Sequence, residues 1–270
     1  MPELPEVETT RRGIAPALEQ RIITGVVVRE RRLRWPVTAD VERLVGQTID
    51  RVGRRAKYLL LGTNAGTAII HLGMSGSLRI VAPDSSPEKH DHFDLLTDAV
   101  DVVRFNDPRR FGSFLWAGDD PFTHPLLAEL GPEPLEEDFN GDRLWQSARG
   151  RKVAVKQHIM NSKIVVGVGN IYASEALFRA GIHPARAAGR VSRQRMQDLA
   201  RSIKDVLAEA IRQGGTTLRD YRGSDGKPGY FKQQLQVYER DGRPCRRCAT
   251  PIRRIVQGQR ATYYCPTCQH

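Results

Sequence analysis

The sequence predicts an α+β fold in two domains. An N-terminal antiparallel sheet domain begins with a helix, and a C-terminal helical domain ends in a β-hairpin. Two observations predict this: short runs rich in β-branched residues fill the first half, and apolar residues recur at helical spacing from Leu144 onwards. The length of 270 residues allows two domains that each have a core.

The chain shows no sign of a membrane or secretory segment. No apolar run approaches the ~20 residues that span a bilayer. The residues before Leu4 contain no basic region, and no apolar run of a secretory signal follows them. We therefore expect an intracellular, soluble protein.

The positive charge is concentrated in the second half of the chain. Residues 1–142 carry 17 basic and 23 acidic side chains, whereas residues 143–270 carry 25 and 8, so the net charges are −6 and +17. A basic half of this size is typical of proteins that bind a polyanion, most often nucleic acid, although a solvated basic face is the alternative. An anionic membrane surface fits poorly, because the basic residues form no face of an amphipathic helix.

The first domain is expected to begin with a helix from Pro5 to Gly13, where the glycine would end it. Short β-rich runs follow at close spacing, which indicates an antiparallel sandwich or barrel. The stretch 123–142, rich in proline, acidic residues and glycine, is interpreted as the passage between the domains. The expected strands are Arg21–Arg31, Lys57–Leu61, Thr67–Leu72, Ser77–Val81, His92–Leu96, Val100–Phe105 and Gly112–Trp116.

The second domain is expected to be helical. Helical spacing marks segments around Gln157–Lys163, Asn170–Ala180 and Ser192–Gln213. A glycine-punctuated turn, 165–170, joins the first two in a helix–turn–helix arrangement with a longer connection than usual. Five glycines follow in 214–230, which we interpret as a mobile loop.

The start of the chain has two interpretations. Removal of Met1 would leave Pro2 as a free secondary amine, followed at once by the carboxylate of Glu3. An α-amino group titrates near pH ~8, and amines that form Schiff bases are established covalent catalysts. The alternative is structural, because proline and acidic residues also suit the first turn of a helix.

The four cysteines lie within the last 26 residues as two CxxC pairs. This spacing predicts a tetrahedral thiolate site for one zinc ion, and four protein ligands make the site structural. Disulfides are the alternative, but we expect a reducing compartment. Arg253, Arg254 and Arg260 would project from a hairpin between the pairs and suit phosphate contacts. The expected ligands are Cys245, Cys248, Cys265 and Cys268.

Several motifs follow one another along the chain: the start Met1–Thr9, the stretches Arg54–Tyr58, His71–Gly76, Lys89–His92, Asp107–Gly112 and Val168–Ala173, and the cysteine pairs. Together they resemble one family, the bacterial formamidopyrimidine-DNA glycosylases (Fpg), which excise oxidised purines. The likeness covers essentially the whole chain and keeps the family's motif order. The related endonuclease VIII group has a glycine where Leu4 stands here, which favours purine lesions.

The resemblance implies a β-sandwich catalytic domain over 1–135, a helix-two-turn-helix DNA-binding domain over 136–230 with a lesion-capping loop at 216–230, and a zinc-finger hairpin over 236–270. It implies a monomer in the bacterial cytoplasm, associated with the nucleoid when bound, that acts on double-stranded DNA containing oxidised purines. The reaction would be base excision followed by β,δ-elimination. A non-catalytic damaged-DNA-binding protein, if Met1 is retained, and a pyrimidine-lesion glycosylase of the endonuclease VIII type are the alternatives.

The resemblance also implies catalytic roles. Pro2 would attack C1′ of a flipped nucleotide and form an imine, with Glu3 as proton shuttle. Lys57, which could instead be an exposed strand lysine, would hold a phosphate and donate a proton in β-elimination. Arg260 would grip phosphates of the extruded nucleotide, since an arginine does not readily give up its proton.

Further residues match DNA-contact positions of the family. Met74, Arg109 and Phe111 would fill the gap left by the flipped base, with Arg109 facing the orphaned cytosine. Met74 and Phe111 could instead belong to the core, and Asn170 could be a helix N-cap. The other matches are His90, Arg151, Lys156 and Asn170; a lysine is frequent where Arg151 stands.

Overall fold

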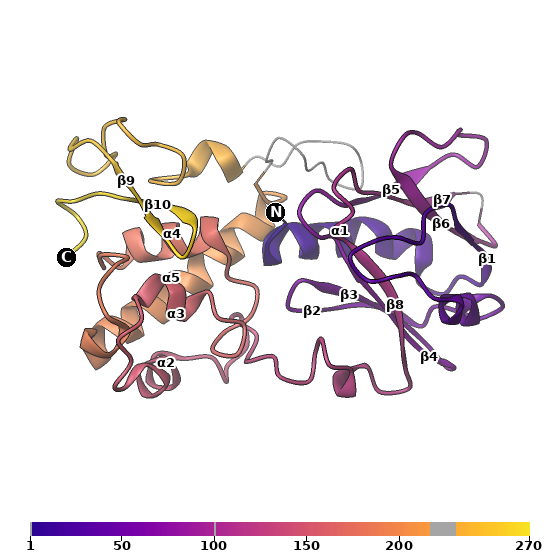
Figure 1. Cartoon of the computed structure of the whole chain (residues 1–270), viewed down its shortest axis with the longest axis horizontal. Helices are drawn as coiled ribbons and strands as arrows, with labels where there is room; N and C mark the ends of the chain where they lie inside the picture. The colour runs from indigo at the N-terminus through magenta and orange to yellow at the C-terminus, as the bar shows by residue number, and fades with distance from the viewer. Residues whose placement is uncertain (1, 100, 217–230) are drawn as a thin grey trace. The chain divides into compact units, whose positions relative to one another are not determined.

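The computed structural model describes residues 2–99, 101–216 and 231–270. It divides into two compact units, Met1–Glu129 with Gln213–Lys232, and Leu130–Arg212 with Gln233–His270 (Figure 1). The finer boundaries 1–135, 136–230 and 236–270 stay a prediction. Among the described residues, no helix is long and apolar enough to cross a membrane.

The first unit contains two four-stranded antiparallel sheets, in the orders β1-β6-β7-β5 and β2-β3-β4-β8. All seven expected strands are present, so the sheet domain predicted from short runs rich in β-branched residues is confirmed as two facing sheets. The strands are β1 (Ile23–Val28), β2 (Arg51–Arg55), β3 (Tyr58–Thr63), β4 (Gly66–His71), β5 (Ser77–Val81), β6 (Asp91–Thr97), β7 (Val102–Asn106) and β8 (Ser113–Gly118).

The edge strand β2 was not expected from the sequence. Its run Arg-Val-Gly-Arg-Arg holds one β-branched residue and a glycine, which is a weak strand signal. It pairs along its whole length with β3, from Arg51 opposite Gly62 to Arg55 opposite Tyr58. Pairing with a strongly apolar neighbour therefore decides the conformation that local propensity leaves open.

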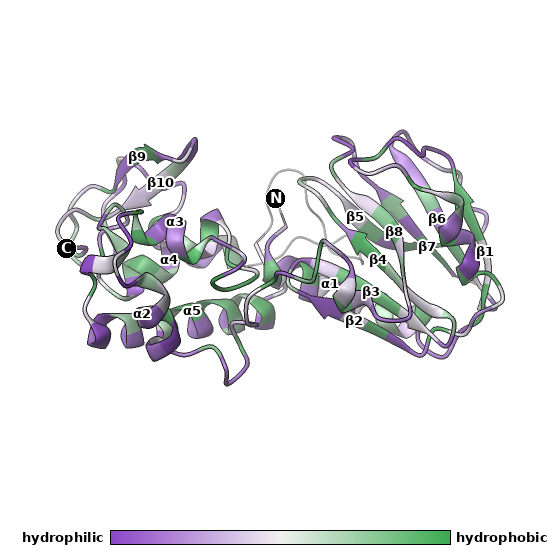
Figure 2. Ribbon diagram, turned by 60° about the horizontal axis from the view of Figure 1, so that its bottom comes forward, coloured by the Kyte–Doolittle hydropathy of each residue, from purple (hydrophilic) through white to green (hydrophobic). Residues whose placement is uncertain are grey.

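One apolar core fills the space between the sheets. Phe93 lies at its centre, with its ring stacked 4.8 Å from Phe105 and 4.4 Å from Phe114 between centroids. Leu59, Ile70 and other fully buried side chains from both sheets join them. Figure 2 shows hydrophobic stretches along the strands of both sheets, and successive residues of the inner strands β3, β4, β6 and β7 are buried.

The helix α1 (Leu4–Leu18) packs against both sheets and is longer than the sequence predicts. The expected end at Gly13 is wrong. Ile14 and Leu18 have no exposed surface, so burial of another turn outweighs the ~1 kcal/mol cost of a helical glycine. Two short 3₁₀ helices, η1 (Ala39–Leu44) and η2 (Pro121–Thr123), complete the connections.

The second unit is helical and contains the hairpin, as expected. The long helix α5 has an apolar and a polar side (Figure 2) and packs on α2 and α4. The helix α3 is shorter than the expected segment 157–163, because the chain turns at Asn161. The elements are α2 (Gly141–Ala148), α3 (Val155–Ile159), α4 (Asn170–Arg179), η3 (Ala188–Arg190), α5 (Arg193–Arg212), η4 (Phe231–Gln234, assigned to both units in part), β9 (Arg253–Gln257) and β10 (Arg260–Tyr264).

The hairpin β9–β10 closes with the two-residue turn Gly258–Gln259, where both residues have positive φ, 52° and 61°. Such turns match the twist of a two-stranded ribbon. A small apolar cluster that includes Phe178 of α4, Val237 and Ile252 joins this region to the helices. The hairpin is thus part of the packed second unit.

Candidate active site and DNA interface

Pro2 and Glu3 lie buried immediately ahead of α1. Glu3 is the N-cap and Pro5 occupies the first helical turn, so Pro5, and not Pro2, has the helix-starting role that the structural alternative gave to Pro2. The Glu3 amide donates to Oε2 of Glu6 at 2.8 Å, which is one half of a capping box. The buried Glu3 is thus held directly after Pro2 in the chain, on a backbone fixed by the start of the helix.

The Glu6 carboxylate also reaches the start of the predicted capping loop. Its Oε1 accepts the amide of Thr216 at 2.7 Å, and a Cβ on Gly215 would lie 3.1 Å from the same oxygen. Both Glu6 and Thr216 are buried. One carboxylate therefore connects the residues beside Pro2 to the segment that leads into the loop; residues 217–230 of that loop lie outside the described residues.

Lys57 was expected to be the first residue of a strand. It lies in the tight turn between β2 and β3, directly before β3 begins at Tyr58. It is half-buried, not exposed as its structural alternative required. Its neighbour Ala56 has φ 54°, and the carbonyl of Ala56 accepts from Nη1 of Arg54 at 2.8 Å. Arg54 in turn donates from Nε to Oε2 of Glu8 at 3.2 Å, which attaches the turn to α1.

His71, at the end of β4, is a candidate that the sequence reasoning did not single out individually. Its Nδ1 accepts the amide of Gly73 at 3.0 Å, and its ring lies 4.8 Å from that of Tyr58. Burial, followed by the charges of Lys57 and Arg34, lowers the pKa of His71 to about 4. The imidazole is therefore neutral at pH 7, and Lys57 and Arg34 concentrate positive charge beside it.

The three expected wedge residues lie at the surface. Met74 is 36 % exposed and Phe111 is 39 % exposed, so the alternative that they belong to the core is wrong. The guanidinium of Arg109 lies 5.0 Å from the centroid of the Phe111 ring, within the range of a cation–π contact. The side chains thus present apolar and hydrogen-bonding surface to solvent.

A buried carboxylate joins the loops that carry the wedge. Asp107 has no exposed surface; its Oδ1 accepts from Oγ of Ser75 at 2.6 Å, and its Oδ2 accepts the amide of Gly112 at 2.7 Å. Gly73 (φ 65°) packs so closely that a Cβ there would lie 2.4 Å from the carbonyl carbon of Phe111. The loop of Met74 and the loop of Arg109 and Phe111 are consequently fixed to each other.

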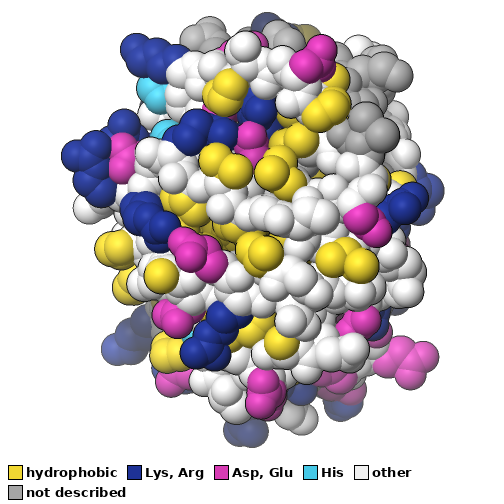
Figure 3. Space-filling view, turned by 90° about the vertical axis from the view of Figure 1, so that its right-hand side faces the viewer, with side chains coloured by type: hydrophobic (Ala, Val, Ile, Leu, Met, Phe, Trp, Pro, Cys, Tyr) yellow, Lys and Arg dark blue, Asp and Glu magenta, His cyan; other side chains and the backbone are white. Residues whose placement is uncertain are grey.

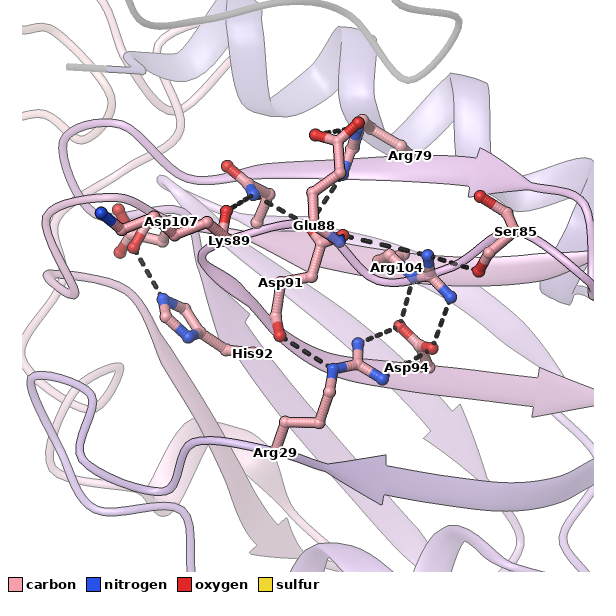
Figure 4. Close-up of polar contacts among 11 residues, drawn as sticks. Arg29, Arg79, Ser85, Glu88, Lys89, Asp91, His92, Asp94, Arg104 and Asp107 are labelled. Carbon is pink, nitrogen blue, oxygen red and sulfur yellow. Dashed lines mark hydrogen bonds and ion pairs between the residues drawn. The ribbon is translucent and has the colours of Figure 1, made fainter.

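His90 precedes β6 in a left-handed conformation with φ 76°. The residue after it, Asp91, is fully buried in a network of ion pairs (Figure 4). Its carboxylate accepts the amide of Glu88 at 2.8 Å and Nη2 of Arg79 at 2.7 Å. Arg104 extends the network by donating to Asp94 and to the carbonyl of Ser85. These bonds hold the segment 82–90, and with it His90, on the sheet.

Lys156 and Asn170 form a buried cluster in the second unit. Nζ of Lys156 donates to Oδ1 of Asn170 at 2.6 Å and to Oγ1 of Thr262 at 2.8 Å. Nδ2 of Asn170 donates to the carbonyl of Ala261 at 3.0 Å. Gly169, and not Asn170, is the N-cap of α4, so the N-cap alternative for Asn170 is wrong. The cluster fixes β10 against α3 and α4.

Glu175 is a second residue that the sequence reasoning missed. It is buried on α4 and accepts three consecutive amides, those of Gln236, Val237 and Tyr238, at 2.8, 3.0 and 2.9 Å. Burial raises the pKa of this carboxyl, and the three donors compensate for the lost water. The Tyr238 hydroxyl accepts from Asn170 at 3.4 Å. In the sequence, Glu175 lies among apolar residues of the expected helix, and this pattern could have indicated a buried carboxylate.

Arg151 and Arg260 are both exposed in the second unit, where phosphates can reach them. Arg260 begins β10, two residues before the buried Thr262. Arg253 and Arg254 are exposed on the opposite strand β9, as predicted. The hairpin therefore presents arginines from a backbone that the Lys156 cluster fixes.

The four cysteine sulfurs lie within 4.8 Å of one another. Measured separations are 3.9 Å for Cys245–Cys268 and 3.5 Å for both Cys248–Cys265 and Cys248–Cys268. A zinc ion with four sulfurs at about 2.3 Å requires separations of about 3.8 Å, whereas a disulfide requires about 2 Å. The donor set fits one structural zinc ion, as predicted, and the disulfide alternative is wrong.

The surface charge of the first unit is mixed where Figure 3 views it. Acidic, basic and apolar side chains lie side by side on the side where β1 and β6 are drawn in Figure 1. No large patch of one sign covers this face, consistent with the −6 net charge of residues 1–142. Broad electrostatic attraction for a polyanion thus comes from the second half of the chain.

Comparisons with known proteins cover nearly the whole chain. Family models match residues 1–114 (formamidopyrimidine-DNA glycosylase N-terminal domain), 130–222 (its H2TH domain) and 242–270 (zinc finger found in FPG and IleRS). A formamidopyrimidine-DNA glycosylase of Thioalkalivibrio sulfidiphilus is 61 % identical over 100 % of both chains. The MutM (Fpg) protein of Thermus thermophilus is 39 % identical with TM-score 0.89, covering 99 % of this chain and 98 % of that one. Lactococcus lactis Fpg in complex with abasic-site DNA is 32 % identical with TM-score 0.92, covering 99 % of both.

Proposed function

Because the chain belongs to the formamidopyrimidine-DNA glycosylase family, a group of base-excision-repair enzymes, we propose that Pro2 is the nucleophile with which it excises oxidised purines. The observation that supports this most is the position of Pro2, buried beside Glu3 and ahead of α1. The substrate is double-stranded DNA that contains 8-oxoguanine or formamidopyrimidines. The enzyme acts in the bacterial cytoplasm, on the nucleoid.

The reaction begins when the secondary amine of Pro2 attacks C1′ of the extruded nucleotide. The bond between C1′ and the base breaks, the base leaves with the electron pair and is protonated, and the Pro2 nitrogen loses its proton, so that C1′ is bonded to both this nitrogen and O4′. The C1′–O4′ bond then breaks, and the Pro2 nitrogen becomes part of an iminium. The sugar ring opens, and Glu3 supplies the proton that O4′ requires. Glu3 is one peptide bond from the nucleophile, so no relay is needed.

Strand cleavage then follows in two eliminations. A proton leaves C2′ and the 3′ phosphate departs, and a second elimination releases the 5′ phosphate. Lys57 holds a phosphate and supplies a proton in the first step; its half-buried turn, next to the neutral His71, supports this role. Arg260 grips phosphates by charge, and Arg151 and His90 contribute backbone contacts.

Met74, Arg109 and Phe111 insert where the base has left the stack. Their exposure, and the Asp107 carboxylate that joins their loops, support this assignment. An apolar wedge lowers the cost of unstacking, and the planar guanidinium can hydrogen-bond the orphaned cytosine. Lys156 acts from inside the unit, where it fixes Asn170 and Thr262, and Asn170 orients the phosphate-binding backbone of β10.

Borohydride trapping tests the proposal. The zinc-loaded protein is incubated with an 8-oxoguanine–cytosine duplex and reduced, and the adduct is digested and located by mass spectrometry. Intact mass first establishes that Met1 is absent. We expect the adduct on the peptide that begins with Pro2. A processed N-terminus without an adduct, or an adduct on a lysine peptide, would contradict the assignment.

A further inference from the structure

A basic depression of about 630 Å³ opens on the second unit. It is lined by His183, Ala185, Arg186, Ala187, Arg190 and His270. The volume lies within the range of small-ligand sites. None of these residues belongs to the site assigned above, and we call the depression the α4-end site because it follows the last turn of α4.

The α4-end site lies at the other end of α4 from Asn170. Asn170 begins α4, whereas His183 follows its end at Arg179, and ten helical residues span about 15 Å. The backbone of Lys156 borders the site, because its amide donates to the Pro184 carbonyl at 3.3 Å. The arginines of the α4-end site are therefore distinct from the proposed contact at Asn170 but lie beside the segment that carries Lys156.

Backbone bonds build the wall of the site from two basic segments. Val155 N donates to the Arg186 carbonyl at 2.8 Å, and Gly189 N donates to the Arg151 carbonyl at 3.0 Å. A Cβ on Gly189 would lie 2.9 Å from that same carbonyl oxygen, so the close approach requires glycine. The segments 151–156 and 183–191 are thus held together, and their cations lie on neighbouring strands of chain.

Within the described part of the chain, no acidic side chain offsets the positive charge of Arg186 and Arg190, and the one carboxylate in the lining is the terminal group of His270. Over residues 2–99, 101–216 and 231–270, no acidic side chain lies within ion-pair distance of Arg186 or Arg190. Burial, and then the charge of Arg186, lower the pKa values of both His183 and Arg195. The positive charge of Arg186 therefore acts on His183 and Arg195, and no acidic side chain of the described residues neutralises it.

One oxygen of the terminal carboxylate of His270 bonds to groups other than Arg186 and Arg190. It accepts the amide of His183 at 3.1 Å and Nη1 of Arg195 at 3.3 Å. Nη2 of Arg195 donates to the Gly181 carbonyl at 2.8 Å. Arg195 thus holds His270, the last residue, against the segment that follows α4. Arg186 and Arg190 can therefore bind an external ligand.

We propose that the α4-end site binds a phosphoryl group, with Arg186 and Arg190 as its charged ligands and His183 and His270 at its rim. Guanidinium groups match phosphate oxygens in shape and charge. The phosphoryl group comes either from the backbone of DNA outside the lesion-binding site or from a free phosphate. Both sources present the same oxygens to the same arginines.

The test follows the histidine ring signals by NMR in the zinc-loaded protein, titrated separately with inorganic phosphate and with a short undamaged duplex. The chain has seven histidines, so the spectrum can be assigned, and His124 of the first unit serves as an internal reference. We expect His183 and His270 to shift with at least one titrant, which identifies the source. The shifts should disappear in the double variant Arg186→Gln/Arg190→Gln.

The control variant Arg21→Gln/Arg43→Gln removes the same charge from exposed arginines of the first unit and should keep the shifts. If the duplex is the ligand, the double variant should also reduce the slope of log affinity against log salt by about 0.9, the value for one phosphate. Cleavage of a short lesion duplex should be unchanged, which separates this site from the catalytic proposal. Unshifted histidines with both titrants, or shifts that persist in the double variant, would overturn the assignment.

Discussion

Glu6→Gln tests whether the carboxylate that caps α1 also positions the capping loop. The Glu6 carboxylate accepts the amides of Glu3 and Thr216, one on each oxygen. Glutamine keeps one acceptor oxygen and turns an NH₂ group toward the other amide. A hydrogen bond to a charged group is worth about 1.5–3 kcal/mol, which corresponds to about 10-fold to 150-fold in rate if the bond is needed in the transition state.

The assay compares two substrates under single-turnover conditions. If residues 216–230 form the predicted lesion-capping loop, excision of 8-oxoguanine needs this loop to hold the extruded base, whereas cleavage of a preformed abasic site has no base to hold. We expect the first rate to fall within the range above and the second to fall much less. Glu19→Gln is the matched control, because the Glu19 carboxylate likewise accepts a backbone amide. This amide is that of Val52, at 2.8 Å, and it lies at the other end of α1. An equal loss on both substrates, or a loss matched by Glu19→Gln, would refute the reasoning.

Three further predictions concern stability, positioning and metal. Burial raises the pKa of Glu8, but hydrogen bonds from Arg11 and Arg12 outweigh burial and lower that pKa from 4.5 to about 2. The ionised Glu8 therefore stabilises the folded state fully above pH 4.5, and this contribution is lost as the pH falls toward 2. Glu8→Gln should therefore lower Tm at neutral pH and have no effect near pH 2, and an effect that is constant with pH would contradict this. Thr262→Val removes an acceptor of the Lys156 ammonium and should weaken DNA affinity about tenfold with zinc retained. Thr262→Ser keeps the hydroxyl and should bind DNA normally. Fluorescence anisotropy measures both affinities, and equal values would exclude a positioning role for Thr262. Cys248→Ser should release zinc and abolish DNA binding while the first unit stays folded, because metal binding supplies folding free energy to a small zinc ribbon; metal analysis and calorimetry measure both, and unchanged affinity without zinc would contradict it.

The sequence was informative wherever a local pattern determines structure. Short runs rich in β-branched residues located seven strands, since such side chains pack well on a pleated sheet. The cysteine spacing located the zinc site, because each CxxC turn brings two sulfurs to one metal. Motif order located Pro2, Glu3 and Lys57, whose chemistry depends on position in the chain.

The sequence was uninformative where long-range packing decides. Strand β2 depends on pairing with β3, and the last turn of α1 depends on the burial of Ile14 and Leu18. Single positions gave no sign that Phe111 is exposed or that Lys156 is 1 % exposed. Both are consequences of how distant segments meet, which neither composition nor spacing encodes.

Buried carboxylates accept hydrogen bonds from loop segments at several places in this protein. Functional side chains lie on loops, whose amides have no ladder partner, and an unpaired buried amide is costly. Glu6, Asp107 and Glu175 each accept two or three hydrogen bonds from segments that flank a proposed functional residue: Glu3 and Thr216, the wedge loops, and Tyr238. The acceptors come from a helix or a strand end, so each loop is fixed by a regular element. The precision of the site thus depends on buried acidic residues, although the overall charge of the chain favours a polyanion.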